Sequence, residues 1–234
     1  FGGGVVGDMC GFVSSIYKRG VDYIQIPTSL IAMADSSIGG KVGVNYQGYK
    51  NQLGSIYHPN KILIDPELLK TLSKEAYRDG LAEVVKIFSL LDRDAFYALK
   101  NTHSLTDELL EKAISLKVKL CLEDEFDQNR RKLLNFGHTI AHGIEAKYGL
   151  SHGESVAYGM VIESQNPLIK ESLQAVGFTF DEAISGLGPY MMQDKKKTQN
   201  TITSIVLSDI GHARLEEVAI REYLQTKHND ISIW

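Results

Sequence analysis

The chain has 234 residues, of which 43% are hydrophobic and 23% charged, so it is long enough to bury one large core or two small ones. Its formal net charge of −4 gives no general attraction to nucleic acid or to anionic membranes, although a small anion can still bind locally. Two distant cysteines exclude a disulfide framework or a cysteine zinc site, and the short apolar runs without a leader predict a cytoplasmic protein with no membrane segment.

The first 65 residues are predicted to alternate between helix and strand. A glycine turn at residues 2–4 precedes a predicted helix over 8–17, and strands follow at 23–26 and 61–64. This pattern is typical of an α/β domain. Because a glycine turn of this kind normally follows a strand, we expect polypeptide before Phe1.

From residue 66 the apolar spacing becomes helical. Helices are predicted over 75–91, 104–124, 132–147 and 154–163, and one late strand over 202–207. The sequence therefore predicts an α/β part over residues 1–65 and a mainly helical part over 66–234.

Two glycine-containing segments are candidates for binding phosphate. In the first, Gly2 to Asp8, backbone N–H groups at a helix start could cradle a diphosphate, although a plain strand-to-helix turn has the same pattern. In the second, a loop predicted from Asp35 to Asn51, small residues would let Lys41 and Lys50 approach one ligand. The alternative is an exposed loop with solvated lysines.

The strongest local chemistry lies in the predicted helix over 132–147. On one helix, Asn135, His138 and His142 would share a face, and Arg131 would lie about two turns before His138. One glutamate with two histidines would suit zinc, whereas His138 and His142 could form a zinc pair by themselves. For any single histidine, a polar surface position is the alternative.

Long strings of the sequence resemble the 3-dehydroquinate synthase family of sugar-phosphate cyclases. They are GGGVVGDMCGF, IPTSLIAMADSSIGGKVGVN, YKNQLGSIYHP, GLAEVVK, LLNFGHTIAHGIE and HGESVAYGM, and the match runs from Phe1 to Met160. The resemblance implies a dehydroquinate synthase-like fold, with an incomplete NAD-binding α/β domain over 1–65 and a helical metal- and substrate-binding domain over 66–234. It also implies NAD and Zn²⁺ as cofactors, with Co²⁺ possible as the metal.

The resemblance also implies roles for individual residues. The metal ligands would be Glu83, His138 and His152. The catalytic positions would be Asp35, Lys41, Lys86, Arg131, Asn135 and His142, and the substrate contacts Arg19, Lys50, Asn51 and Lys196. The NAD contacts would be Gly4, Val5, Val6, Gly7, Asp8, Thr28, Ser29, Lys41, Lys50, Leu68, Leu69, Lys70 and Thr71. Because the arginine matched by Arg19 reaches the phosphate of a neighbouring subunit, a homodimer is implied.

The implied reaction converts 3-deoxy-arabino-heptulosonate 7-phosphate to 3-dehydroquinate and phosphate, in the shikimate pathway of aromatic amino acid biosynthesis. It proceeds by NAD-mediated oxidation, phosphate elimination, reduction and intramolecular aldol closure. Other sugar-phosphate cyclases and metal-dependent polyol dehydrogenases are the alternatives. The second histidine, His142, favours the dehydroquinate branch, because valiolone-type relatives typically lose it.

The sequence departs from the family pattern in two places. The family carries a further segment before the glycine turn, so the chain as given is expected to bind NAD poorly, and the stretch between Met160 and Asp194 is short. A truncated, non-catalytic remnant is therefore a further alternative. The retention of Glu83, His138 and His152 argues against it.

Overall fold

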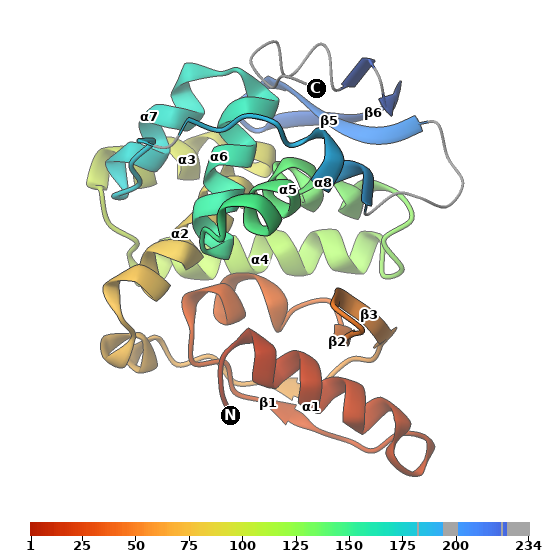
Figure 1. The fold of residues 1–234 in the computed structure, drawn as a ribbon. Helices are drawn as coiled ribbons and strands as arrows, with labels where there is room; N and C mark the ends of the chain where they lie inside the picture. Colours follow the sequence, from red (N-terminus) through yellow and green to blue (C-terminus); the bar gives the residue numbers. More distant parts are fainter. Residues whose placement is uncertain (182, 194–200, 221, 224–234) are drawn as a thin grey trace. The chain divides into compact units, whose positions relative to one another are not determined.

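The computed structural model describes residues 1–181, 183–193, 201–220 and 222–223, and Figure 1 shows their fold. The chain forms two compact units, one from Phe1–Val84 with Thr106–Arg131 and the other from Val85–Leu105 with Lys132–Trp234. The predicted domain division at residue 66 stays a prediction. Within the described residues, every helix is too short or too polar to cross a bilayer.

The first unit has the predicted α/β character. It contains α1 (Gly4–Ile16), η1 (Tyr17–Arg19), β1 (Ile24–Gln25), η2 (Ala32–Ser36), β2 (Lys41–Tyr46), β3 (Tyr49–Ile56), β4 (Lys61–Ile62), η3 (Pro66–Thr71), the N-terminal part of α2 (Lys74–Leu91) and α4 (Asp107–Glu123). The predicted strands are confirmed as the parallel pair β1 and β4, each two residues long. Gly2 extends this pairing through an isolated parallel bridge to Pro27.

The segment between Asp35 and Asn51 is not the loop that was predicted. It contains the π-helix η2 and the antiparallel hairpin of β2 and β3. The hairpin turns at Gln47 and Gly48, whose φ values of 49° and 83° are those of a two-residue turn matching the twist of paired strands. Lys50 and Asn51 therefore lie on β3, whereas the prediction had placed them in a flexible loop.

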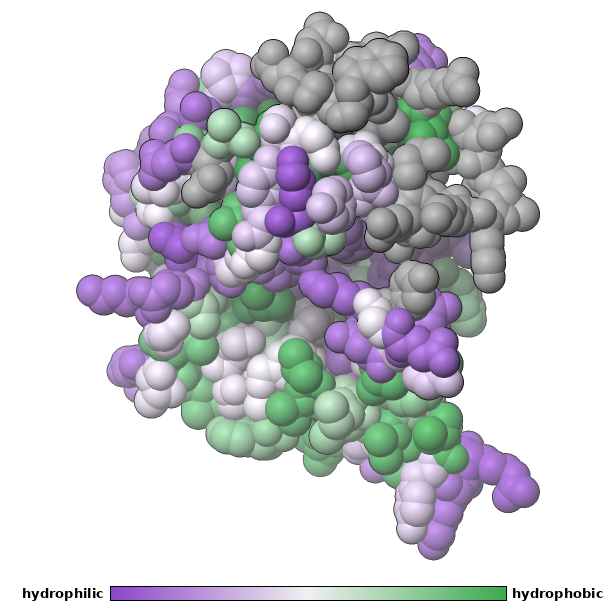
Figure 2. Space-filling model, viewed as in Figure 1, coloured by the Kyte–Doolittle hydropathy of each residue, from purple (hydrophilic) through white to green (hydrophobic). Residues whose placement is uncertain are grey.

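Exposed apolar side chains follow one line along α1. Val5, Met9 and Val13 recur every four residues, and they are 77%, 51% and 51% exposed. Figure 2 shows hydrophobic surface gathered over this part of the first unit. The opposite face of α1 is the one that packs, since Gly7 and Gly11 are buried.

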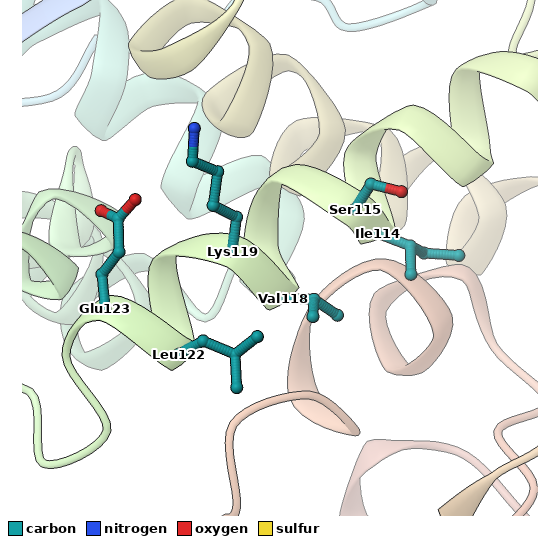
Figure 3. Close-up of a pocket in the computed structure, with 6 residues that line it drawn as sticks. All are labelled: Ile114, Ser115, Val118, Lys119, Leu122 and Glu123. Atoms are coloured by element: carbon teal, nitrogen blue, oxygen red, sulfur yellow. The ribbon is translucent and has the colours of Figure 1, made fainter.

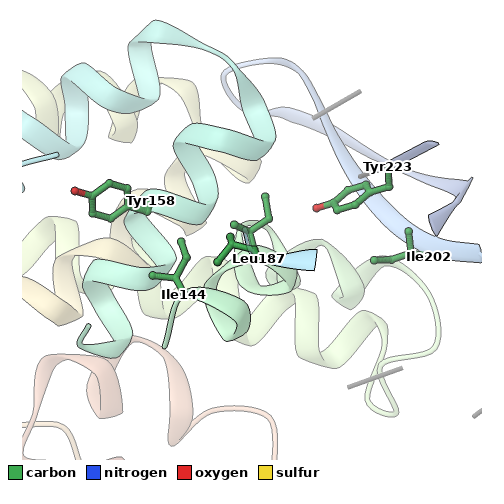
Figure 4. Close-up of a cluster of buried hydrophobic side chains, with 6 residues drawn as sticks. Ile144, Tyr158, Leu187, Ile202 and Tyr223 are labelled. Carbon is green, nitrogen blue, oxygen red and sulfur yellow. The ribbon is translucent and has the colours of Figure 1, made fainter. Parts of the chain in front are cut away.

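The second unit is mainly helical, as predicted. After the C-terminal part of α2 it contains α3 (Arg93–Thr102), the end of η4 (Arg130–Asn135), α5 (His138–Tyr148), α6 (His152–Ser164), α7 (Pro167–Ala175), α8 (Gly188–Gln193), β5 (Thr201–Asp209) and β6 (His212–Ala219). The predicted late strand is confirmed as β5, which pairs antiparallel with β6. A core cluster joins α5, α6 and β5, and it contains Ile140, Ile144, Tyr158, Leu187, Ile202 and Tyr223 (Figure 4).

The single helix predicted over 132–147 is wrong, because the chain breaks at Gly137. This residue has φ +77° and precedes α5, while residues up to Asn135 belong to the short 3-10 helix η4. A left-handed backbone is much less strained for glycine than for residues with a side chain, so Gly137 can end one helix and start the next. Asn135 and Arg131 are consequently not on the helix that carries His138 and His142.

Candidate active site

The glycine turn brings together residues predicted to contact NAD. The Gly2 N–H donates to Ile26 O at 3.1 Å, and the Thr28 N–H donates to Gly2 O at 2.9 Å. A side chain on Gly3 would meet Ser29 Oγ at 3.3 Å, so the turn and Ser29 are close neighbours. The first N–H groups of α1 have no intrahelical acceptor, which makes this turn suited to an anion.

Ser29 also caps a local helical turn. Its hydroxyl accepts a hydrogen bond from the Ala32 N–H at 3.3 Å. A serine that caps its own helical turn still has a second lone pair for a ligand. The cap and a cofactor contact are therefore compatible.

Behind the glycine turn lies a partly buried charged cluster of Asp8, Asp35 and Lys117. Asp35 forms an ion pair with Lys117, whose side chain is 6% exposed. The pKa of Asp8 is raised to about 6, mainly by burial and then by the Asp35 charge, with Lys117 opposing the shift. The electrostatics of Asp8 are therefore set by residues far away in the sequence.

The sequence interpretation missed Lys117. It lies on α4 in register with the buried residues Leu110, Ala113, Leu120 and Cys121. A lysine on the apolar face of an amphipathic helix is a signal of a buried ion pair, because an unpaired ammonium would be costly there. That signal was present in the spacing.

Arg131 forms hydrogen bonds to two backbone carbonyls and one carboxylate within the first unit. It is 3% exposed, its Nη2 donates to Gly39 O at 2.9 Å, and its Nη1 donates to Glu125 O at 2.8 Å. Its backbone N–H donates to Asp124 Oδ2 at 3.0 Å. A guanidinium has five N–H donors, so these bonds orient the side chain without exhausting it.

The other predicted contacts lie on several different elements. Lys41, at the start of β2, pairs with Asp127. The residues 68–71 lie in η3, which Asp65 caps by accepting from the Glu67 N–H at 3.0 Å. Arg19 is exposed at the end of η1, and Lys196 lies outside the described residues.

Glu83, His138 and His152 converge. One potential ligand atom from each lies within 4.8 Å of the others, the only such metal-binding group in the described part of the chain. Glu83 is fully buried on α2, the helix that continues from the first unit into the second, and Lys86 follows it one turn later, 1% exposed. His138 and His152 are the first residues of α5 and α6.

In both candidate histidine ligands, Nδ1 has a hydrogen-bond partner. His138 Nδ1 lies 3.1 Å from Phe136 O, and His152 Nδ1 lies 2.8 Å from Glu145 Oε1. Because a carbonyl and a carboxylate only accept hydrogen bonds, a neutral imidazole in either contact carries its proton on Nδ1, which makes Nε2 the atom that could coordinate a metal. Two imidazole nitrogens and one carboxylate form the three-ligand set of a catalytic zinc site, with a position left for substrate.

His142 stays outside this set of three. Its ring centre is 6.2 Å from that of His138, and the third member of the group is Glu83. A zinc pair of His138 and His142 alone stays an alternative, whereas the converging group of three contains His152 and Glu83. His142 is placed beside the site, where a group that moves protons would be useful.

Glu163 supports the turn before His138, and the sequence interpretation missed it. The side chain is 1% exposed and accepts from the Gly137 N–H at 2.6 Å and from Tyr223 Oη–H at 3.1 Å. Burial and this carboxylate raise the pKa of Tyr223 well above its usual value. A glutamate on an otherwise buried helix face was the available signal.

An open hollow of about 480 Å³ lies along α4, away from these residues. Figure 3 shows its lining, which comes entirely from α4: Ile114, Ser115, Val118, Lys119, Leu122 and Glu123. The candidate site residues do not line it.

Comparison with known proteins places this geometry in context. Residues 1–79 match the family described as 3-dehydroquinate synthase N-terminal, and residues 80–176 match 3-dehydroquinate synthase C-terminal. The 3-dehydroquinate synthase of Clostridium beijerinckii is 38% identical over 243 residues, covering 94% of this chain and 69% of the relative.

Solved structures agree on the fold. The 2-epi-5-epi-valiolone synthase of Streptomyces hygroscopicus subsp. jinggangensis, with NAD⁺ and Zn²⁺ bound, has a TM-score of 0.85 at 26% identity, covering 97% of this chain and 70% of that one. A 2-deoxy-scyllo-inosose synthase, solved with carbaglucose-6-phosphate, NAD⁺ and Co²⁺, has a TM-score of 0.82 at 22% identity, with 97% and 72% covered. The second likeness concerns the fold alone.

Proposed function

This chain belongs to the 3-dehydroquinate synthase family, and from that premise we propose that it converts 3-deoxy-arabino-heptulosonate 7-phosphate to 3-dehydroquinate and phosphate. It is an enzyme of the lyase class that uses NAD and a divalent metal. The single observation that carries the proposal is the convergence of Glu83, His138 and His152 within 4.8 Å. A non-catalytic remnant has no chemical need for such a group.

Sequence identity separates the alternatives. The chain is 38% identical to a 3-dehydroquinate synthase and 26% identical to a valiolone-type cyclase over nearly its whole length. His142, beside the site, also favours the dehydroquinate branch. The deoxyinosose and valiolone reactions are therefore less well supported.

We propose that Glu83, His138 and His152 hold Zn²⁺ or Co²⁺. When bound there, the metal supplies Lewis acidity that polarises a substrate hydroxyl or carbonyl. Glu83 contributes an anionic oxygen from a fully buried position, and the two histidines offer their Nε2 atoms. Lys86, buried one turn after Glu83, would bind an anionic group of the substrate.

The remaining roles are assigned by charge and reach. Lys41, Arg131 and, from a partner subunit, Arg19 would hold the phosphate and stabilise the charge it gains as it leaves. Asn135 and His142 would orient the ring-forming hydroxyls and move protons to and from them. Asp35, Lys50, Asn51 and Lys196 complete the proposed substrate contacts.

NAD binding is assigned to the glycine turn and its neighbours. NAD supplies a hydride acceptor that returns the hydride within each turnover. The N–H groups of Gly4, Val5 and Val6 would bind its diphosphate, and the nearby Thr28 and Ser29 would add hydroxyl contacts, whereas the Gly7 N–H already donates to Gly3 O. Asp8, Lys41, Lys50 and residues 68–71 are the further proposed contacts.

Assembly and location are also proposals. The exposed position of Arg19 at the end of η1 suits a contact with a partner's substrate, so we propose a homodimer. Cys10 and Cys121 are free thiols, which fits the reducing cytoplasm.

The reaction is tested by following phosphate and NADH together. The protein is incubated with the heptulosonate phosphate, NAD and Zn²⁺, and phosphate release is expected to require both cofactors while NADH stays constant. Because the hydride is returned, net accumulation of NADH would contradict the cyclase and favour a metal-dependent polyol dehydrogenase. A chelator is expected to abolish release.

A further inference from the structure

The contact between Glu145 and His152 links the last turns of α5 to the first residue of α6. Glu145 Oε1 lies 2.8 Å from His152 Nδ1, and the Glu145 side chain is 9% exposed. The chain reverses between them at Gly149, whose φ is +68°, and Ser151 then caps α6. The left-handed backbone of Gly149 and the capped start of α6 thus bring Glu145 and His152, seven positions apart, into contact.

We propose that Glu145 is a positioning residue that sets both the orientation and the electron-donating strength of His152 as a metal ligand. The carboxylate keeps the proton on Nδ1, so that Nε2 is the atom presented to the metal. It also fixes the ring plane, which a water molecule in its place would not do. This inference rests on the proposed metal site.

The two histidine ligands are not equivalent in this respect. His138 Nδ1 faces the neutral carbonyl of Phe136 at 3.1 Å, whereas His152 Nδ1 faces an anionic carboxylate at a shorter distance. A charged acceptor makes a stronger hydrogen bond and a more basic imidazole. His152 is therefore the stronger nitrogen donor of the pair.

Charge balance gives a second reason. Glu83 is fully buried and Glu145 is nearly so, so with a metal bound both carboxylates would act where water screens charge little. Together they offset the double charge of Zn²⁺ or Co²⁺. Removing the Glu145 charge while keeping its shape is expected to weaken metal binding.

The test is a Co²⁺ titration of the metal-free protein, followed by visible absorption and by competition with a chromophoric chelator. Glu145→Gln keeps an acceptor for Nδ1–H but loses the charge, and Glu145→Ala loses both. We expect affinity to fall about 10-fold to 100-fold, more for Ala than for Gln, as for other second-layer partners of metal ligands. The Co²⁺ absorption bands of the Ala variant should shift, because His152 is no longer held in one orientation.

Two control variants make the result interpretable. Glu154→Gln removes the charge of a carboxylate two residues after His152 but keeps the capping box with Ser151, since Gln also serves there, so it should fold and leave Co²⁺ affinity unchanged. His152→Ala should abolish tight binding. Thermal unfolding of each metal-free variant shows whether it folds.

Each outcome has a distinct meaning. If His152→Ala abolishes binding while both Glu145 variants bind Co²⁺ as tightly as the unaltered protein, the role of Glu145 is wrong and the metal site stands. If His152→Ala also binds normally, the proposed metal site itself is wrong. Should Glu145→Ala fail to fold, the isosteric Glu145→Gln decides alone.

Discussion

The carboxylate of Glu163 lies 2.6 Å from the backbone N of Gly137, the residue that directly precedes the metal-ligand candidate His138. The backbone of α6 reinforces this contact, since a side chain on Gly159 would meet Gly137 O at 2.1 Å. The turn that sets the start of α5 is thus held from two sides by α6.

Glu163→Ala is expected to lower the free energy of unfolding by about 3 kcal/mol, because it removes the acceptor of two buried N–H groups, those of Gly137 and Ile205, and of the buried Tyr223 hydroxyl. Tyr223→Phe is the matched control. It removes one donor and keeps the ring, so a loss of about 1 kcal/mol is expected. Urea unfolding measures both, and equal losses for the two variants would argue against Glu163 as the centre of the network.

His138→Ala and His142→Ala are expected to separate metal binding from proton transfer. Only His138 belongs to the converging group, so its replacement should remove stoichiometric metal and all turnover. His142→Ala should retain the metal and lose kcat. Metal content after desalting and phosphate release are the two readouts, and loss of metal from His142→Ala would place that residue among the ligands.

Asp8→Asn is expected to change how stability depends on pH. The pKa of Asp8 is raised to about 6, mainly by burial and then by Asp35, so the folded state holds its proton more tightly than the unfolded state. Stability from this group is full below pH 4 and is lost as pH rises to about 6. Asn mimics the neutral acid.

At pH 8 the Asn variant should therefore be the more stable protein, by about 1 kcal/mol once solvent screening is allowed for. Below pH 4 the difference should vanish. Urea midpoints taken at several pH values give the comparison, and a constant difference across the range would mean that Asp8 does not titrate as described.

Lys117→Met is expected to cost about 3 kcal/mol, because it leaves the Asp35 carboxylate without its partner in a partly buried position. The double variant Asp35→Asn with Lys117→Met should be more stable than Lys117→Met alone, since no uncompensated charge remains. A double-mutant cycle in urea measures the coupling. Additive single effects would show that the pair contributes nothing jointly.

Arg19→Ala should raise KM for the sugar phosphate about 10-fold or more, the loss of one charge-assisted contact with phosphate. If Arg19 serves the partner's site, mixing Arg19→Ala protomers with His138→Ala protomers should restore activity, because one site of the mixed dimer is intact. Phosphate release by the mixture is the measurement. No gain over the separate variants would assign Arg19 to its own subunit.

Much of the candidate site could be predicted from the sequence. The motif strings identified Glu83, His138 and His152, and their convergence agrees with that set. Helices such as α2 and α4 followed from three- and four-residue apolar spacing, which depends on local periodicity alone. The same strings predicted the family and its cofactors, because matches this long in polar and glycine residues do not arise by coincidence.

The tertiary structure decided what local patterns leave open. The apolar spacing of residues 132–147 predicts one continuous helix, but the helix is interrupted at Gly137. Glycine adopts a left-handed backbone there, and the hydrogen bond to Glu163 on α6 stabilises this conformation. Glu145, Lys117 and Glu163 acquire their roles only through residues that meet them in space: His152, Asp35, and Gly137 with Tyr223. The sequence gives the identity of each charged residue. Whether that residue is buried, and which group it pairs with, depends on packing against residues that are far away in the chain.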